Sequence, residues 1–191
     1  MATLTGKKIN CAVFISGAGS NLKSIIKHSK KRKFPIKVKL VISNNPKAKG
    51  INFAKKNEID FEIIRSKKTN IFEKKVYQQL NKRKIKLICL AGFMKILSPK
   101  FIKRFKGKIL NIHPSLLPKY KGLNTHKRAL KNNENYSGCT VHYVTSKLDS
   151  GKIILQKKVR IRENDTVYSL QKRVLKEEYK IYPKAISKIL N

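Results

Sequence analysis

Apolar residues lie in short runs rich in Val, Ile and Leu, and these runs alternate with stretches of helical spacing. Ile9–Ser16 is the first run and predicts a buried strand, whereas Leu22, Ile25 and Ile26 share one face of a predicted helix over Asn21–Lys31. The same reasoning predicts further strands at Ile36–Ser43, Ile59–Ile64, Ile85–Ala91 and Lys108–Asn111. It predicts further helices at Lys47–Asn57, Ile71–Arg83 and Pro99–Phe105. Ser98 is the candidate N-cap of the last of these helices, because proline follows it at the first helical position.

The pattern changes after residue 110. A proline-bounded loop leads to a short predicted helix at Thr125–Lys131. The predicted strands Gly138–Thr145 and Ile153–Ile161 have no long helix between them, which indicates an antiparallel pair. The last predicted helix, Val167–Leu190, contains Pro183, which we expect to kink it or divide it in two.

Together these elements predict one α/β domain over residues 1–191. Strands that alternate with helices favour a Rossmann-like, mostly parallel twisted sheet of about seven strands with helices on both faces. No internal repeat, linker or low-complexity segment divides the chain. In such sheets ligands bind beyond the carboxyl ends of the strands, so candidate chemistry is sought there.

The charge of the chain is strongly positive, since 46 basic and 10 acidic residues give a net charge of +36. An excess of this size is typical of proteins that meet phosphates, nucleic acids or anionic surfaces. The basic residues are mostly lysine, however, and they are spread along the whole chain without a basic arm. Arginine is the residue that bidentate nucleic-acid recognition prefers. A solvated surface enriched in lysine by an AT-rich coding sequence is therefore favoured over a polyanionic partner, and both interpretations stay open.

Cysteine and histidine usage points away from disulfides and metal sites. Cys11, Cys89 and Cys139 lie far apart inside apolar runs, as reduced core thiols of a cytoplasmic protein do. The histidines show no spacing typical of zinc sites, so no metal is expected. No apolar run reaches the roughly 18 residues that a membrane span needs, so no membrane association is expected.

A glycine loop, Ser16–Asn21, follows the first predicted strand and opens a helix. Backbone N–H groups at a helix N-terminus bind anions, so the loop suits a phosphate monoester. It lacks the third glycine of a dinucleotide fingerprint and the Gly-Lys-Ser/Thr of a P-loop. An ordinary glycine turn is the alternative.

Asn111 and His113 end the fifth predicted strand, and the alternation of side chains places both on the same face. A carboxamide beside an imidazole can stabilise an oxyanion and deliver a proton, although a histidine capping a proline loop would look the same. Asp149 lies in the turn between the last two predicted strands, where Asp is common for structural reasons. If that turn folds back over the fifth strand, Asp149 should raise the pKa of His113 and accept a proton.

Three long motifs then carry a resemblance. Asn-Ile-His-Pro-Ser-Leu-Leu-Pro-Lys-Tyr at 111–120, Leu-Ala-Gly-Phe-Met-Lys-Ile-Leu-Ser-Pro at 90–99 and Leu-Asp-Ser-Gly-Lys-Ile-Ile-Leu-Gln at 148–156 resemble the glycinamide ribonucleotide formyltransferases. The resemblance runs from the glycine loop to Ile181–Pro183. It implies formyl transfer from 10-formyltetrahydrofolate to the amino group of N1-(5-phosphoribosyl)glycinamide in de novo purine (IMP) biosynthesis, with no metal.

By the same resemblance, Asn111, His113 and Asp149 are the catalytic residues. The residues implied to hold the phosphate and ribose of the substrate are Gly19, Ser20, Asn21 and Glu178. The residues implied to bind the folate are Met94, Lys95, Ile96, Leu97, Asn111, His142, Thr145, Ser146, Lys147 and Leu148. Residues 1–110 would then form a phosphate-binding half and residues 111–191 a catalytic and folate-binding half.

The chain departs from the resembling family at a few positions. Lys95 stands where arginine is common, Asn124 replaces the first histidine of His-Thr-His, and Lys121 replaces the proline of Tyr-Pro-Gly. The basic surface could compensate in binding anionic polyglutamylated folates. Small-molecule substrates are the expected partners, with no specific nucleic acid and a monomer or homodimer.

Three other functions compete with this interpretation. A formyltetrahydrofolate deformylase would carry an N-terminal regulatory domain, and a methionyl-tRNA formyltransferase would carry a further C-terminal domain; neither is expected here. A nucleic-acid-binding module would need an arginine-rich and aromatic basic motif, which the sequence lacks.

Overall fold

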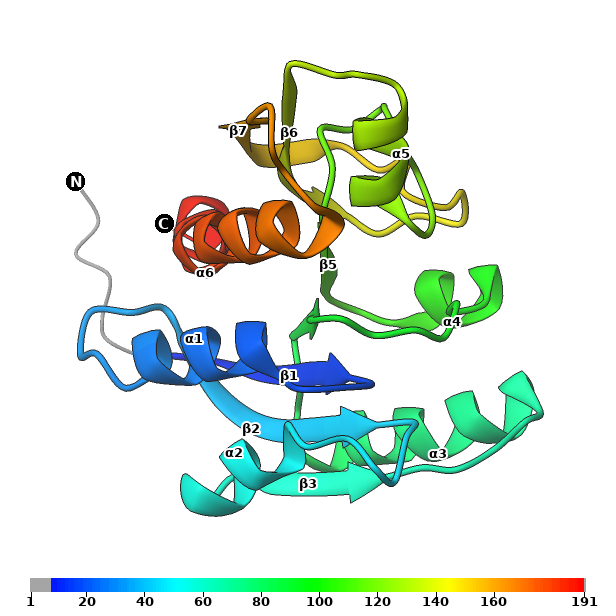
Figure 1. Cartoon of the computed structure of the whole chain (residues 1–191). Helices are drawn as coiled ribbons and strands as arrows, with labels where there is room; N and C mark the ends of the chain where they lie inside the picture. The colour runs from blue at the N-terminus through cyan, green and yellow to red at the C-terminus, as the bar shows by residue number, and fades with distance from the viewer. Residues whose placement is uncertain (1–7, 191) are drawn as a thin grey trace. The chain divides into compact units, whose positions relative to one another are not determined.

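All of the predicted strands and helices are present in the computed structural model, which describes residues 8–190 (Figure 1). Most boundaries agree within a few residues, and Ile36–Ser43 and Thr125–Lys131 agree at both ends. The seven strands follow the order β3-β2-β1-β4-β5-β6-β7 in a mostly parallel sheet, so the predicted fold class is confirmed. The chain separates into two compact units, residues 8–109 with Leu190 and Leu110–Ile189.

The first unit is a parallel α/β layer built on a buried central strand. Its strands are β1 (Ile9–Ile15), β2 (Ile36–Ser43), β3 (Asp60–Ile63) and β4 (Leu87–Leu90). Strand β1 pairs in parallel with both β2 and β4, and β2 pairs in parallel with β3. The side chains from Cys11 to Ile15 are fully buried, which explains why this strand is an unbroken apolar run.

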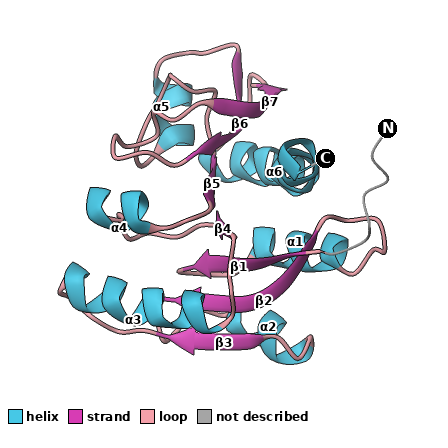
Figure 2. Ribbon diagram, turned by 180° about the vertical axis from the view of Figure 1, so that it is seen from behind, coloured by secondary structure: helices cyan, strands magenta, loops and turns pink. Residues whose placement is uncertain are grey.

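Helices lie on both faces of this parallel sheet. They are α1 (Ser20–Ser29), α2 (Ile51–Lys56), α3 (Thr69–Lys82) and α4 (Pro99–Arg104). Figures 1 and 2, seen from opposite sides, place α1 and α2 on one face of β1–β3 and α3 on the other. Helix α4 begins as its sequence predicts, because the Ser98 hydroxyl accepts from the Phe101 N–H at 3.1 Å and Pro99 occupies the first turn.

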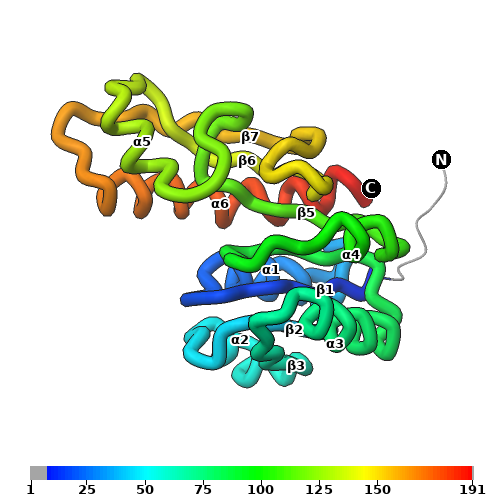
Figure 3. The backbone as a smooth tube through the Cα atoms, turned by 90° about the vertical axis from the view of Figure 1, so that its right-hand side faces the viewer, coloured from blue at the N-terminus to red at the C-terminus, as the bar shows by residue number. Residues whose placement is uncertain are grey.

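The second unit turns from parallel to antiparallel pairing. Strand β5 (Lys108–His113) pairs antiparallel with β6 (Tyr136–Tyr143), which pairs antiparallel with β7 (Ile153–Arg160), as the sequence predicts. Strand β5 continues to His113, past the predicted end at Asn111, because its last residue pairs with Thr140 of β6. Figure 3 follows the backbone from β5 through α5 (Thr125–Lys131), β6 and β7 into α6.

Helix α6 (Val167–Leu190) closes this unit as one continuous helix. Of the two outcomes expected at Pro183, a kink or a division, the division is wrong. Tyr182 and Ala185 beside Pro183 are fully buried, and the Tyr182 hydroxyl donates to the carbonyl oxygen of Leu110 at 3.2 Å. Packing of this apolar face offsets the roughly 3 kcal/mol that an interior proline costs a helix. No helix within residues 8–190 is long and apolar enough to cross a membrane.

Candidate active site

The glycine loop of the first unit leaves a helix N-terminus open for an anion. Helix α1 starts at Ser20, Gly19 precedes it in the left-handed conformation with φ of 72°, and no side chain caps its first N–H groups. No acidic residue lies in its first turn. The N–H groups of the first turn and the positive end of the helix dipole therefore face the same point, which suits a phosphate.

Hydrogen bonds from neighbouring strand ends fix the loop. The Ser16 hydroxyl donates to Asn44 Oδ1 at 2.6 Å and accepts from the Met94 N–H at 2.8 Å. The Gly50 N–H donates to the Gly17 carbonyl at 3.0 Å. The loop is thus tied to the segments after β2 and β4, and the predicted folate-wall residue Met94 contacts the predicted phosphate loop through Ser16.

Gly19 is required by space as well as by backbone conformation. A Cβ atom at Gly19 would lie 2.6 Å from the Cα of Gly50, whereas a Cβ at Gly17 would have no neighbour within 4 Å. Because Gly50 offers backbone rather than a movable side chain, the clash cannot be relieved by a rotamer change.

We therefore expect Gly19→Ala to lower the stability of the protein by about 2 kcal/mol, since strain at a left-handed position adds to the clash. That loss corresponds to a fall in Tm of about 4–8 °C for a domain of this size. Thermal unfolding of Gly19→Ala beside Gly17→Ala, the matched control, measures it. Equal Tm values for the two variants would contradict the steric argument.

Asp149 meets both Asn111 and His113 in the second unit. Its Oδ2 lies 3.4 Å from His113 Nδ1, and its Oδ1 lies 3.5 Å from Asn111 Nδ2. Asp149 itself has a left-handed backbone with φ of 45°, and its side chain is buried. The turn between β6 and β7 therefore folds back over the end of β5, and the three predicted catalytic residues lie together.

His142 of β6 joins this group from the neighbouring strand, opposite Asn111 in the register. Its Nδ1 lies 2.9 Å from the Tyr143 carbonyl, which can only accept, so Nδ1 carries a proton. Its Nε2 lies 3.3 Å from Asn111 Nδ2 and accepts from that amide. The role in folate binding that the resemblance implies for His142 stays a prediction, and the structure adds its contact with the amide of Asn111.

Burial dominates the titration of His113. Burial lowers its pKa below the ordinary value of 6.5, and the Tyr120 carbonyl and Asp149 raise it without restoring it. The direction predicted for the effect of Asp149 is therefore correct, but the effect of burial on the pKa is larger. Burial of an imidazolium costs more than this neighbouring carboxylate returns.

The pKa of Asp149 moves in the opposite sense to what burial alone would do. Burial raises this pKa. It is lowered by contact with His142, by the Gly122 N–H at 2.9 Å and by the charges of His113 and His142, and together these effects outweigh burial. Asp149 is thus ionised at neutral pH. Its contribution to stability is present above the unfolded carboxyl pKa and is lost as the pH falls through the lowered folded value.

Apart from Asn111 on β5 and His142 on β6, the predicted folate residues lie in two segments, one in each unit. After β4, Met94 and Ile96 are largely exposed, Leu97 is buried, and the Lys95 ammonium lies 5.6 Å from the centre of the Phe72 ring. Exposed apolar side chains of this kind suit a flat apolar ligand.

The other segment, Thr145–Leu148, is an exposed turn that leads into Asp149. The Thr145 hydroxyl donates to the Lys147 carbonyl at 3.2 Å and closes the turn. Gly151 allows that closure, because a Cβ there would collide with the Tyr143 carbonyl oxygen at 1.8 Å. Any ligand held by this turn would lie next to Asp149 in the chain.

Glu178 lies buried on α6 and acts electrostatically on Cys139 of β6, whose thiol pKa is raised first by burial and then by Glu178. Cys11, Cys89 and Cys139 are buried free thiols, as predicted. Among residues 8–190, no three His, Cys, Asp or Glu side chains form a group that could hold a metal ion.

Sequence reasoning missed the segment that surrounds the catalytic trio. The His113 Nε2–H donates to the Tyr120 carbonyl at 2.9 Å, and the Gly122 N–H donates to Asp149. Tyr120 and Asn124 have φ of 57° and Gly122 has φ of 77°, so three of five residues are left-handed. Gly122 could have indicated this left-handed segment, because a glycine in a loop often adopts a positive φ.

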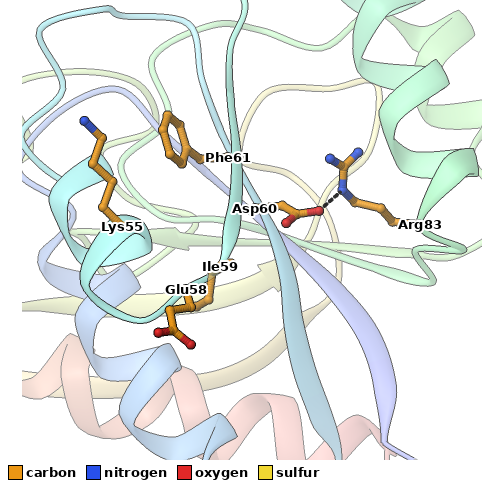
Figure 4. A pocket seen from close by; sticks show the side chains of 6 residues that line it. All are labelled: Lys55, Glu58, Ile59, Asp60, Phe61 and Arg83. Atoms are coloured by element: carbon orange, nitrogen blue, oxygen red, sulfur yellow. Dashed lines mark hydrogen bonds and ion pairs between the residues drawn. The ribbon is translucent and has the colours of Figure 1, made fainter.

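A separate pocket of about 660 Å³ lies at the amino end of β3, away from the glycine loop (Figure 4). Its lining residues are Lys55, Glu58, Ile59, Asp60, Phe61 and Arg83. Arg83 pairs with Asp60 at 2.8 Å, and the Lys55 ammonium lies 5.6 Å from the Phe61 ring centre. None of the predicted site residues lines this pocket.

Comparison with known proteins gives one family and several relatives. The formyl transferase family matches residues 9–186. A phosphoribosylglycinamide formyltransferase of Haemophilus influenzae is 46% identical over 94% of this chain and 85% of its own length. The human trifunctional purine biosynthetic protein adenosine-3 is 42% identical over 94% of this chain, which spans 18% of that protein.

Solved structures agree with the sequence relatives. The phosphoribosylglycinamide formyltransferase of Brucella melitensis has a TM-score of 0.91 and 38% identity, with 96% of each chain covered. That of Anaplasma phagocytophilum has the same TM-score and 40% identity, with 96% of this chain and 87% of its own covered. The resemblance predicted from the three motifs is confirmed.

Proposed function

This chain belongs to the formyl transferase family, and we propose that it transfers the formyl group of 10-formyltetrahydrofolate to the amino group of N1-(5-phosphoribosyl)glycinamide, a step of de novo purine synthesis. The observation that carries the proposal is the convergence of Asn111, His113 and Asp149 within 3.5 Å contacts at the end of β5. The buried thiols fit the cytoplasmic location that this activity implies.

Direct acyl transfer fits these residues without a covalent enzyme intermediate. The substrate amine attacks the formyl carbon, the carbonyl oxygen becomes an oxyanion, and the bond from that carbon to the folate N10 then breaks. The amine loses one proton and N10 gains one, so the exchange balances. The residues have to stabilise the oxyanion and move that proton.

Asn111 supplies a neutral donor whose orientation His142 fixes. Asp149 is ionised, so it can receive the amine proton directly or through water. His113 starts mostly neutral because burial lowers its pKa, but a negative oxyanion beside it favours imidazolium. Its charge therefore develops together with that of the oxyanion, when the amine proton received by Asp149 passes to His113 Nδ1, and that same proton is then available to the departing N10.

The proposal also assigns the residues that hold the two substrates. Gly19, Ser20 and Asn21 would hold the substrate phosphate, and Glu178 the glycinamide ribose end. Met94–Leu97 of the first unit and, in the second unit, Asn111, His142 and Thr145–Leu148 are each assigned to contacts with the folate. The lack of a side-chain cap on α1 supports the first assignment, and the exposed Met94 and Ile96 support the folate assignment.

A product assay tests the activity. Purified protein with both substrates should give formylated ribonucleotide and tetrahydrofolate in equal amounts, with little formate when the acceptor is left out. A parallel reaction offers uncharged and aminoacylated tRNA as acceptor. Formyl release without acceptor, or product in the tRNA reaction alone, would overturn the proposal.

A further inference from the structure

Residues 120–122 make hydrogen bonds to both His113 and Asp149. The Tyr120 carbonyl accepts from His113 Nε2 at 2.9 Å, and the Gly122 N–H donates to Asp149 Oδ2 at 2.9 Å. Because a carbonyl can only accept, the first contact fixes the proton of neutral His113 on Nε2 and turns Nδ1 toward Asp149, 3.4 Å away. The position of this short segment therefore sets the geometry of the pair.

The segment does not hold itself. The left-handed φ values of Tyr120 and Asn124 are uncommon for residues other than glycine, and such a backbone persists only where the surroundings determine it. At one end, the Tyr120 hydroxyl donates to Glu134 Oε1 at 2.7 Å and accepts from Asn132 Nδ2 at 3.0 Å. The middle of the segment needs a separate support.

Arg128 of α5 provides that support. Its Nη1 donates to the Lys121 carbonyl at 2.6 Å and lies 3.5 Å from the Leu123 carbonyl, and its guanidinium lies 5.1 Å from the centre of the Tyr120 ring. One planar side chain thus contacts three of the four residues from 120 to 123. A lysine at this position could keep the charge but would lose the planar guanidinium that faces the Tyr120 ring and brings Nη1 to both carbonyls.

We propose that Arg128 is a positioning residue for catalysis, which clamps residues 120–123 so that Tyr120 and Gly122 hold His113 and Asp149 in register. The inference rests on the catalytic roles proposed above for His113 and Asp149. Arg128 is exposed and contacts neither of those side chains by hydrogen bond in the described structure, so it acts through the segment it clamps.

A test has to separate the effect of the Arg128 charge on His113 from the effect of the Arg128 contacts with residues 120–123. Burial lowers the pKa of His113, and the charges of His142 and Arg128 lower it as well. The Tyr120 carbonyl and Asp149 raise it. The charge of His113 in turn lowers the pKa of buried His126. Arg128→Lys keeps the positive charge but removes the planar guanidinium. A change in this variant therefore measures the loss of the contacts with residues 120–123. Lys127→Met, next to it on α5 and also exposed, removes a charge and leaves the clamp, so it is the matched control.

We expect Arg128→Lys to lower kcat about tenfold, with KM for both substrates changed less than about twofold, since a misplaced catalytic group costs turnover rather than binding. The His113 pKa, followed by NMR, should fall as the Tyr120 hydrogen bond is lost. Lys127→Met should keep wild-type kcat.

Wild-type kcat and an unchanged His113 titration in folded Arg128→Lys would overturn the proposal. His113→Asn in the same assay separates the proposed role of His113 from the proposed role of Arg128. If it keeps activity, the proposed role of His113 fails, while the NMR titration of Arg128→Lys still decides whether Arg128 positions the ring. If it is inactive and Arg128→Lys matches wild type in both measurements, the clamp alone is wrong.

Discussion

Replacing His113 or Asn111 by alanine should lower kcat by about 10²-fold or more, the usual effect of removing a general acid or an oxyanion donor. Both side chains lie at the end of β5 and both contact Asp149, so each loss should act on turnover. The two effects should not add in the double variant, because the residues act on one oxyanion. Single-turnover rates of the folded variants measure this.

His28→Ala is the control for these variants. His28 lies on α1 in the first unit, where its ring contacts the Ser24 carbonyl and Phe34. It should keep kcat near the wild-type value. Near-normal turnover in either His113→Ala or Asn111→Ala would remove that residue from the mechanism, whatever its place in the structure.

Asp149→Asn should produce the other large effect, a fall in kcat of at least about 10²-fold. The substitution keeps an oxygen that can accept from the Gly122 N–H, so the turn keeps its shape. It removes the carboxylate that raises the pKa of His113, and that pKa should therefore fall below its already lowered value. The imidazolium that meets the oxyanion then forms less readily.

An NMR titration of His113 beside single-turnover rates across pH tests the sign and the size. Glu163→Gln removes a carboxylate from an exposed position of the same unit and should move neither measurement. A His113 pKa that stays constant or rises in Asp149→Asn would contradict the electrostatic role. Normal rates together with a constant pKa would leave Asp149 as a turn residue.

The order of the helices and strands and their approximate boundaries follow from local patterns in the sequence. Apolar runs and N-cap residues are local features of the sequence, so β1 as an apolar run and α4 with its Ser98 cap could be predicted without knowing the fold. The loop at Gly19 and the shared face of Asn111 and His113 are equally local. Long motifs, in turn, identified the family before any geometry was known.

Other features depend on contacts between segments far apart in the sequence, so local patterns could not predict them. The net direction of the His113 pKa depends on burial, which a strand-end sequence does not state, and burial proved larger than the effect of Asp149. The continuity of α6 through Pro183 depends on how well its apolar face packs. The clamp of Arg128 on residues 120–123 joins a helix to a left-handed loop, and no pattern of hydrophobic and polar residues encodes that contact.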